Sequence, residues 1–328
     1  MMRFRKHSLA SAFAIAVSLS ACDAGTSVAI APLPSPPPTP APPSIEAAAQ
    51  AALPAASAYP QAEASGPTID NHVNTDFPLI ESAVTINLSG LVAEQHSTGD
   101  LAFEATGDPA DSYTLNVPDL GISTVHFAAG GYYCYSSKCG DTGSSSVDLN
   151  MADPATTNLS WTTYGFWTSR SYAASGPLTT AAFVTGYRTP VGSMPTVGTA
   201  TYTGAAQGRL MAARDYGYLG VGIDSLSGDA TLLADFGSGT LSGSLTNMVG
   251  PGGAWNNVSL VGAITSGDFT GTAAVTSSPG TFGSMSGSAT GTFAGSFFGP
   301  SAQELGAVWT LHDGTSTAVG TIGASHGP

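Results

Sequence analysis

The sequence predicts an all-β protein, in which a small, loop-rich β domain precedes an eight-stranded antiparallel up-and-down β-barrel. Short strand-like runs follow one another and are broken by Gly, Pro, Asp and Asn. Helix signals are almost absent after residue 68. The last eight runs are spaced as hairpins, and an even number of antiparallel strands closes into a barrel without free edges.

Apolar and polar residues alternate within the C-terminal runs. Leu241 and Leu245 face one way and Ser242 the other. This alternation predicts a filled core of Ala, Gly, Leu and Phe under a Thr/Ser exterior, with glycines that let the strands bend. A transmembrane barrel is the alternative, but it needs an apolar outer band with aromatic girdles. The predicted strands are Thr199–Leu210, Gly228–Phe236, Thr240–Asn247, Val258–Thr265, Phe269–Thr276, Met285–Phe298, Leu305–Leu311 and Ala318–Ile322.

The preceding region, residues 69–189, has fewer and less regular strand signals. Irregular segments separate its runs, which is typical of a small, loop-rich β domain. The strands predicted here are Val84–Val92, Ser112–Val117, Ser123–Ala129, Asn158–Trp167 and Ala181–Arg188.

The N-terminus predicts export and lipidation. Arg3, Arg5 and Lys6 precede a short apolar segment, which ends in Leu19-Ser20-Ala21-Cys22. Such a segment is too short to span a bilayer permanently and is typical of a signal peptide. Small residues directly before a cysteine resemble a bacterial lipobox, so we predict a signal peptide over residues 1–21 and acylation of Cys22, for example by palmitate. Ordinary cleavage beside an incidental cysteine is the alternative.

A spacer is predicted after Cys22, over residues 22–68. Residues 32–43 are proline-rich and favour extended polyproline geometry. Without its signal peptide the chain has five basic and 22 acidic residues, a net charge of −17. Nucleic-acid binding is therefore not expected, and the lipid rather than charge holds the protein at the membrane.

Two further cysteines, Cys134 and Cys139, have four residues between them in a short loop. In an oxidising compartment this spacing favours a disulfide. A metal site is the alternative, but no further ligands complete a set of four, so no metal is expected.

A distinctive block runs from Phe297 to Trp309. Gly299-Pro300 ends a strand-like run, and Ser301 with Glu304 forms the pattern of a capping box. The block therefore predicts one turn of helix between two strands. Glu304 is expected to cap that turn rather than to act as an acid catalyst.

Three segments in consistent order resemble the β-barrel domain of transferrin-binding protein B. Residues 194–204 resemble its start, residues 233–243 its second hairpin, and residues 295–306 its closing segment. Residues 159–167 are similar to the handle region of shorter relatives. The resemblance implies a handle domain over 69–189 and a barrel domain over 190–328, forming one lobe where transferrin-binding protein B has two.

The resemblance also implies a function. Members are surface lipoproteins of Gram-negative bacteria that capture iron carriers or related ligands, and some one-lobed relatives bind haem. We therefore expect an outer-membrane, surface-exposed binding lipoprotein with an iron-carrier or other ligand and an outer-membrane transporter as partners. A structural envelope lipoprotein without a ligand is the alternative. No enzyme is expected, because no nucleophile elbow or phosphate-binding loop occurs.

Candidate ligand-binding residues are few. Three tyrosines crowd the short loop around Cys134, and rigid aromatic clusters suit recognition surfaces, although they also pack in cores. His126 is the best candidate for a haem ligand. Arg170 and Arg188 are rare cations that pair either internally or with a ligand. The full set is Tyr132, Tyr133, Tyr135, His126, Arg170 and Arg188.

Overall fold

The computed structural model describes residues 75–87, 90–95, 100–104, 112–120, 122–127, 138–152, 157–173, 176–213 and 221–327. Strands dominate these residues, with short 3-10 turns at η2 (Pro118–Leu120) and η3 (Val191–Ser193). None of the helices described is long and apolar enough to cross a membrane.

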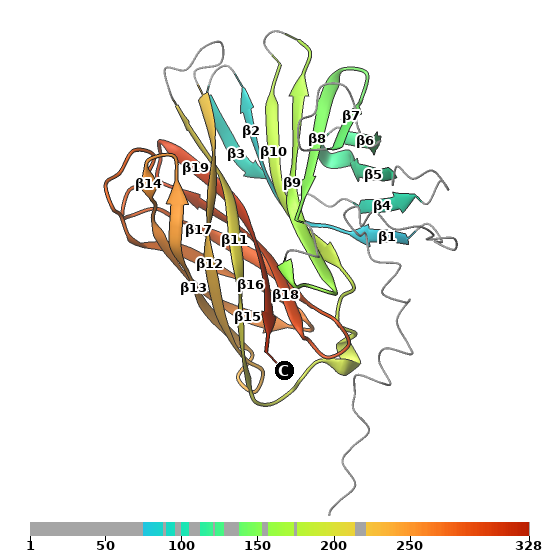
Figure 1. Cartoon of the computed structure of the whole chain (residues 1–328), viewed down its shortest axis with the longest axis vertical. Helices are drawn as coiled ribbons and strands as arrows, with labels where there is room; N and C mark the ends of the chain where they lie inside the picture. The colour runs from blue at the N-terminus through green and yellow to red at the C-terminus, as the bar shows by residue number, and fades with distance from the viewer. Residues whose placement is uncertain are drawn as a thin grey trace, which may run out of the picture. The chain divides into compact units, whose positions relative to one another are not determined.

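The C-terminal strands form a closed antiparallel barrel (Figure 1). Each strand pairs with the next, and the first pairs with the last, so no edge is left open. The predicted up-and-down barrel is confirmed. Its eight strands are β11 (Thr199–Ala213), β12 (Val221–Asp235), β13 (Thr240–Gly250), β15 (Asn257–Thr265), β16 (Asp268–Ser277), β17 (Thr290–Phe298), β18 (Glu304–His312) and β19 (Ser316–His326).

Several strand bounds of the barrel differ from the prediction: β12 begins at Val221 rather than at Gly228, and β19 ends at His326 rather than at Ile322. Residues 278–289 form a loop before β17, which begins at Thr290 rather than at Met285. A two-residue strand, β14 (Gly253–Ala254), pairs with the end of β13. The loop at residues 278–289 and strand β14 lie where Ser, Pro and Gly interrupt the alternation of apolar residues. The strand boundaries there are therefore hard to predict from the sequence.

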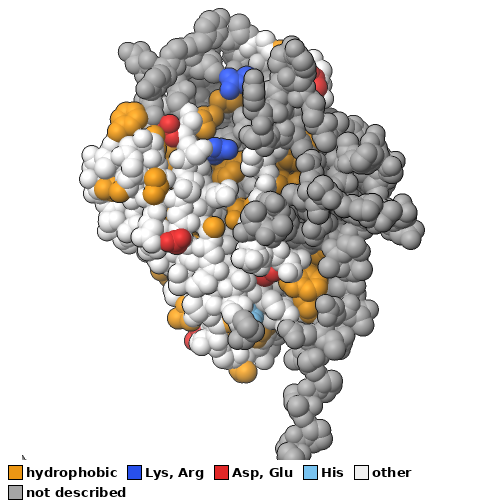
Figure 2. Space-filling model, viewed as in Figure 1, with side chains coloured by type: hydrophobic (Ala, Val, Ile, Leu, Met, Phe, Trp, Pro, Cys, Tyr) orange, Lys and Arg blue, Asp and Glu red, His pale blue; other side chains and the backbone are white. Residues whose placement is uncertain are grey.

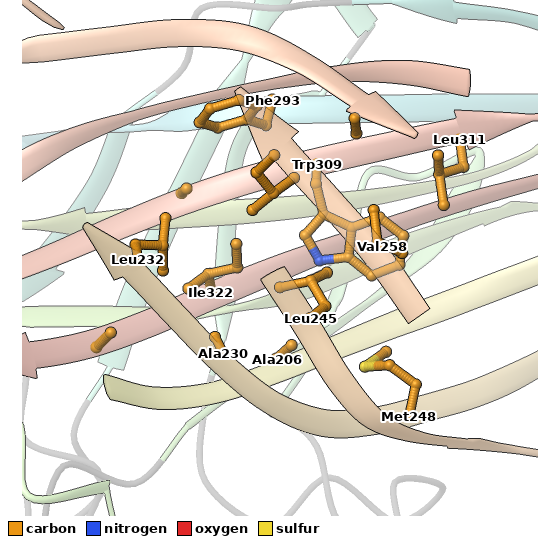
Figure 3. Packing of buried hydrophobic residues seen from close by; sticks show 14 of the residues in the cluster. Ala206, Ala230, Leu232, Leu245, Met248, Val258, Phe293, Trp309, Leu311 and Ile322 are labelled. Carbon is orange, nitrogen blue, oxygen red and sulfur yellow. The ribbon is translucent and has the colours of Figure 1, made fainter. Parts of the chain in front are cut away.

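Side chains fill the barrel interior (Figure 3). Leu241 and Leu245 are buried in it while Ser242 is exposed, as the alternation predicts. Glycines make room for the large rings. A Cβ on Gly320 would lie 2.3 Å from the Trp309 indole and 2.2 Å from the carbonyl oxygen of Gln207. The glycine is therefore required for the close approach of the indole to the wall.

The N-terminal strands form two antiparallel sheets. The predicted strand Ser112–Val117 is confirmed, whereas the predicted strand Val84–Val92 is wrong, because it joins the end of one strand to the start of its hairpin partner. The four-stranded sheet has the order β1 (Thr75–Pro78), β4 (Asp100–Glu104), β5 (Ser112–Val117), β6 (Ile122–Phe127). The six-stranded sheet has the order β3 (Gly90–Gln95), β2 (Ile80–Asn87), β10 (Leu178–Gly186), β9 (Thr162–Ser171), β8 (Ser145–Met151), β7 (Lys138–Asp141).

The six-stranded sheet is covered on both faces. Trp167 and Phe183 pack with residues of the four-stranded sheet, such as Phe127. Tyr164 and Val184, on the other face, pack with barrel residues that include Met211, Phe298, Val308 and Val319. Every residue of β10 is buried as a result. A strand buried on both faces is a continuous apolar run rather than an alternating one.

Small residues let the barrel wall and the six-stranded sheet approach each other. A Cβ on Gly323 of β19 would lie 2.1 Å from the Tyr164 ring. A Cβ on Gly306 of β18 would lie 3.0 Å from the Thr162 hydroxyl oxygen. The outward-facing glycines of β18 and β19 therefore mark where the sheet packs on the barrel.

Glu304 joins the two parts directly. Its carboxylate accepts hydrogen bonds from the backbone N–H groups of Ser160 (2.6 Å), Trp161 (2.9 Å) and Thr162 (2.9 Å), at the start of β9. The side chain is only 4% exposed. Burial raises the pKa of this carboxyl, and the three hydrogen bonds oppose that shift.

The predicted helical turn with its capping box is wrong. Glu304 lies in β18, and residues 299–303 form a strand-connecting turn with positive φ at Gly299 and Ala302. The Ser301 N–H donates to the Gln303 side chain instead. The sequence pattern identified a carboxylate that binds free backbone N–H groups, but those groups belong to a segment more than a hundred residues away.

We expect Gly320→Ala to lower the free energy of unfolding by about 2–3 kcal/mol, because the new methyl group overpacks against Trp309 and the β11 backbone. Urea unfolding followed by tryptophan fluorescence measures this. Gly287→Ala is the matched control, since a Cβ there has no neighbour within 4 Å. Equal stability of the two variants would contradict the packing argument.

We expect Glu304→Gln to cost about 2 kcal/mol of stability and Glu304→Ala about 3 kcal/mol or more, because charged hydrogen bonds to buried donors are lost. Asp268→Asn is the control. It breaks only an exposed ion pair and should cost about 1 kcal/mol or less. Chemical denaturation of the three variants compares them, and a Glu304→Ala protein as stable as wild type would refute the role of this carboxylate.

Candidate functional site

One end of the barrel carries a long loop, residues 278–289, between β16 and β17. The segment around Trp255 holds one side of it. The Trp255 indole N–H donates to the Gly283 carbonyl (2.9 Å). The Asn256 amide is fully buried and exchanges hydrogen bonds with the backbone of Met285 (2.9 Å and 2.7 Å). These bonds order the loop against β15.

Asp313, in the turn between β18 and β19, holds the other side of the loop. Its Oδ2 accepts from the Ser286 N–H (3.0 Å), and its Oδ1 accepts from the N–H groups of Thr315 and Ser316. Burial alone would raise the pKa of Asp313, but these hydrogen bonds outweigh it and the pKa is lowered. The loop is thus anchored to strands on both sides.

Apolar side chains project from this ordered end. Phe282, in the loop, is 61% exposed and Val249, at the end of β13, is 51% exposed. The backbone of Phe282 lies against Gly252, beside β14. Large apolar groups held outward on anchored loops are typical of recognition surfaces. We call Val249, Phe282 and the loops that carry them the loop end of the barrel.

The hairpin between β9 and β10 points toward the same end. Thr162, the first residue of β9, donates its N–H to Glu304, the first residue of β18, so the two strands begin side by side. Further along β9, Phe166 contacts Arg209. Arg209 and Thr310 of β18 both pair with Val319, so Phe166 lies beside the later part of β18. The two strands therefore run in the same direction. Tyr172, at the tip of β9, is 58% exposed and donates to the Asp141 carboxylate.

The two predicted arginines have different surroundings. Arg188 forms an exposed ion pair with Asp268 (3.2 Å). It pairs with Phe298 at the end of β17, which is the end of the barrel opposite the loop end. Arg170 is exposed on β9, opposite Leu178 and Ser146 in the register. The structure does not bring the two arginines together.

Most of the other predicted site residues lie outside the described residues. These are Cys22 with its predicted lipidation, the loop residues Tyr132, Tyr133 and Tyr135, and Cys134 of the predicted disulfide. Cys139 belongs to β7 and is opposite Asp148, and His126 belongs to β6 and is opposite Thr114, but the structure describes neither side chain. Their roles stay predictions.

Sequence reasoning missed Phe282, Tyr172 and Arg209. An exposed phenylalanine between Thr281 and Gly283, in a Ser/Gly-rich segment, was a usable signal for a surface loop. Arg209 gave no such signal, because it lies within a strand. Within the described ranges, no three His, Cys, Asp or Glu side chains are placed to hold a metal ion.

Residues 194–326 match the family model of the C-lobe and N-lobe β-barrels of transferrin-binding protein B. The match lies within the barrel region predicted from sequence, residues 190–328, and its limits coincide with the segment before β11 and the end of β19. No curated protein sequence matches the chain.

Solved structures of transferrin-binding protein B are also similar to the chain. A point variant from Haemophilus parasuis is 19% identical, with a TM-score of 0.47 over 75% of this chain and 45% of that one. The isotype 1 protein from serogroup B Neisseria meningitidis is 16% identical, with a TM-score of 0.44 over 76% of this chain and 44% of that one. The chain thus spans less than half of these proteins.

The resemblance that the sequence motifs indicate is therefore confirmed for the C-terminal region. The family model matches residues 194–326, and the same part of the chain forms the closed eight-stranded barrel. Residues 194–326 form a β-barrel domain of the kind found in the lobes of transferrin-binding protein B.

Proposed function

We propose that this protein is a lipid-anchored binding protein of the bacterial outer membrane, displayed at the cell surface, that captures a protein ligand of the iron-carrier class. The family match of the barrel is the observation that carries the proposal. The predicted lipobox at Cys22 and the proline-rich spacer after it support the surface location.

The loop end of the barrel is the proposed contact surface. Phe282 and Val249 are exposed there, yet the loops that hold them are anchored through Asn256 and Asp313. An ordered loop loses little conformational entropy on binding, so exposed apolar groups on it contribute more to affinity. Tyr172, at the tip of β9, extends this surface.

We expect the purified full chain to bind an iron carrier such as transferrin in a surface plasmon resonance assay, and the double change Phe282→Ser with Val249→Ser to weaken binding at least tenfold, as loss of central apolar contacts does. Val197→Ser is the control, since Val197 is even more exposed (76%) but lies before β11, away from the loop end. Serum albumin serves as the control ligand. The absence of carrier binding, or an equal loss in both variants, would count against the proposal.

We expect Cys22→Ser to release the protein from the membrane fraction, because acylation at that residue is the predicted anchor. Fractionation of cells that express each form measures this. External protease on intact cells should degrade the wild-type protein, and its protection would argue against surface display.

A further inference from the structure

A half-buried cation lies on the barrel wall that faces the six-stranded sheet. The guanidinium carbon of Arg209, in β11, is 5.0 Å from the centre of the Phe166 ring of β9. One terminal nitrogen donates to the Ser225 hydroxyl of the neighbouring strand β12. The ring and the hydroxyl together hold the guanidinium in one orientation.

The ionic surroundings of Arg209 differ from those of Arg188. Among the residues that the structure describes, no carboxylate pairs with Arg209, whereas Arg188 has Asp268 at 3.2 Å. Burial lowers the pKa of Arg209. In a chain of net charge −14, where acidic groups are plentiful, this is an unusual arrangement.

A second arginine shares the same side of the six-stranded sheet. Tyr164 and Phe166 face the barrel, so Arg170, further along β9 on the same face, faces that way too. Asp148, opposite Thr168, interacts with it: burial raises the pKa of Asp148 and Arg170 lowers it. Figure 2 shows basic side chains beside hydrophobic atoms in the upper half of the face it presents.

Together, the side chains of Arg209, Arg170 and Asp148 carry a net charge of one positive unit. This positive charge attracts an anionic group on a ligand. The guanidinium of Arg209 uses one terminal nitrogen for Ser225 and keeps further N–H groups for another acceptor. A planar carboxylate matches that remaining edge with two parallel hydrogen bonds.

We propose that Arg209 is the centre of a carboxylate-binding site between the barrel wall and the six-stranded sheet, with Ser225 and Phe166 orienting the guanidinium and Arg170 adding long-range attraction. The carboxylate belongs either to an acidic peptide segment or to a free organic acid. The site is separate from the loop end and does not depend on capture of an iron carrier there.

The test uses the full chain, with chloride replaced by each probe at constant ionic strength. The probes are N-acetylglutamate, a hexaglutamate peptide, acetate and inorganic phosphate. We expect a carboxylate probe to raise the thermal unfolding midpoint by several degrees over chloride, and calorimetric titration to give one site per chain. A stronger response to hexaglutamate indicates a peptide ligand, and an equal or stronger response to acetate indicates a small acid.

Variants locate the site. Arg209→Gln should abolish the response, and Arg209→Lys, which keeps the charge but not the fork of donors, should weaken it at least tenfold. Arg188→Gln, at a paired arginine, should leave it unchanged. Circular dichroism checks folding, and Arg209→Lys carries the test if Arg209→Gln is unfolded. The absence of any preference over chloride, an equal response to phosphate, or an unchanged response in Arg209→Lys would each overturn the proposal. Carrier binding at the loop end is measured separately, so either proposal can fail alone.

Discussion

The structure depends on one constraint: the six-stranded sheet must be buried on both faces at once. One face packs on the four-stranded sheet and the other on the barrel wall, and every residue of β10 is buried between them. Burial of this kind removes water from the polar groups at the contact, so each of them needs a partner. Glu304 supplies it for three backbone N–H groups at the start of β9.

The same contact determines which residues face the sheet. Where β18 and β19 pack against it, Gly306 and Gly323 leave space for Thr162 and Tyr164. Beyond that contact, the barrel wall presents Arg209 and Ser225 instead of small residues. Arg209 and Ser225 thus form a polar patch on a wall whose neighbouring residues, such as Val319 and Met211, pack on the sheet.

The contacts with the N-terminal region and the proposed contact surface lie at opposite ends of the barrel. The turn at residues 299–303 is committed to the junction, since Gly299, Ala302 and the Glu304 carboxylate all bond to the N-terminal region or to the segment that links it to the barrel. Within the described residues, the loops at the opposite end form no such bonds to the N-terminal region. They are anchored locally through Asn256 and Asp313. Substitutions in those loops can therefore change what is bound without disturbing the junction.

The sequence by itself determined the eight barrel strands, because period-two alternation and turn residues are local signals, and its motifs identified the barrel family. It could not assign Glu304, whose three donors lie more than a hundred residues away, nor the contact of Arg209 with Phe166. It also joined β2 to β3, and it placed β10 at Ala181–Arg188 instead of Leu178–Gly186, since a strand covered on both faces loses its alternation. Only the tertiary structure decided these points, because the partners meet through the packing of the sheet on the barrel and not through spacing along the chain.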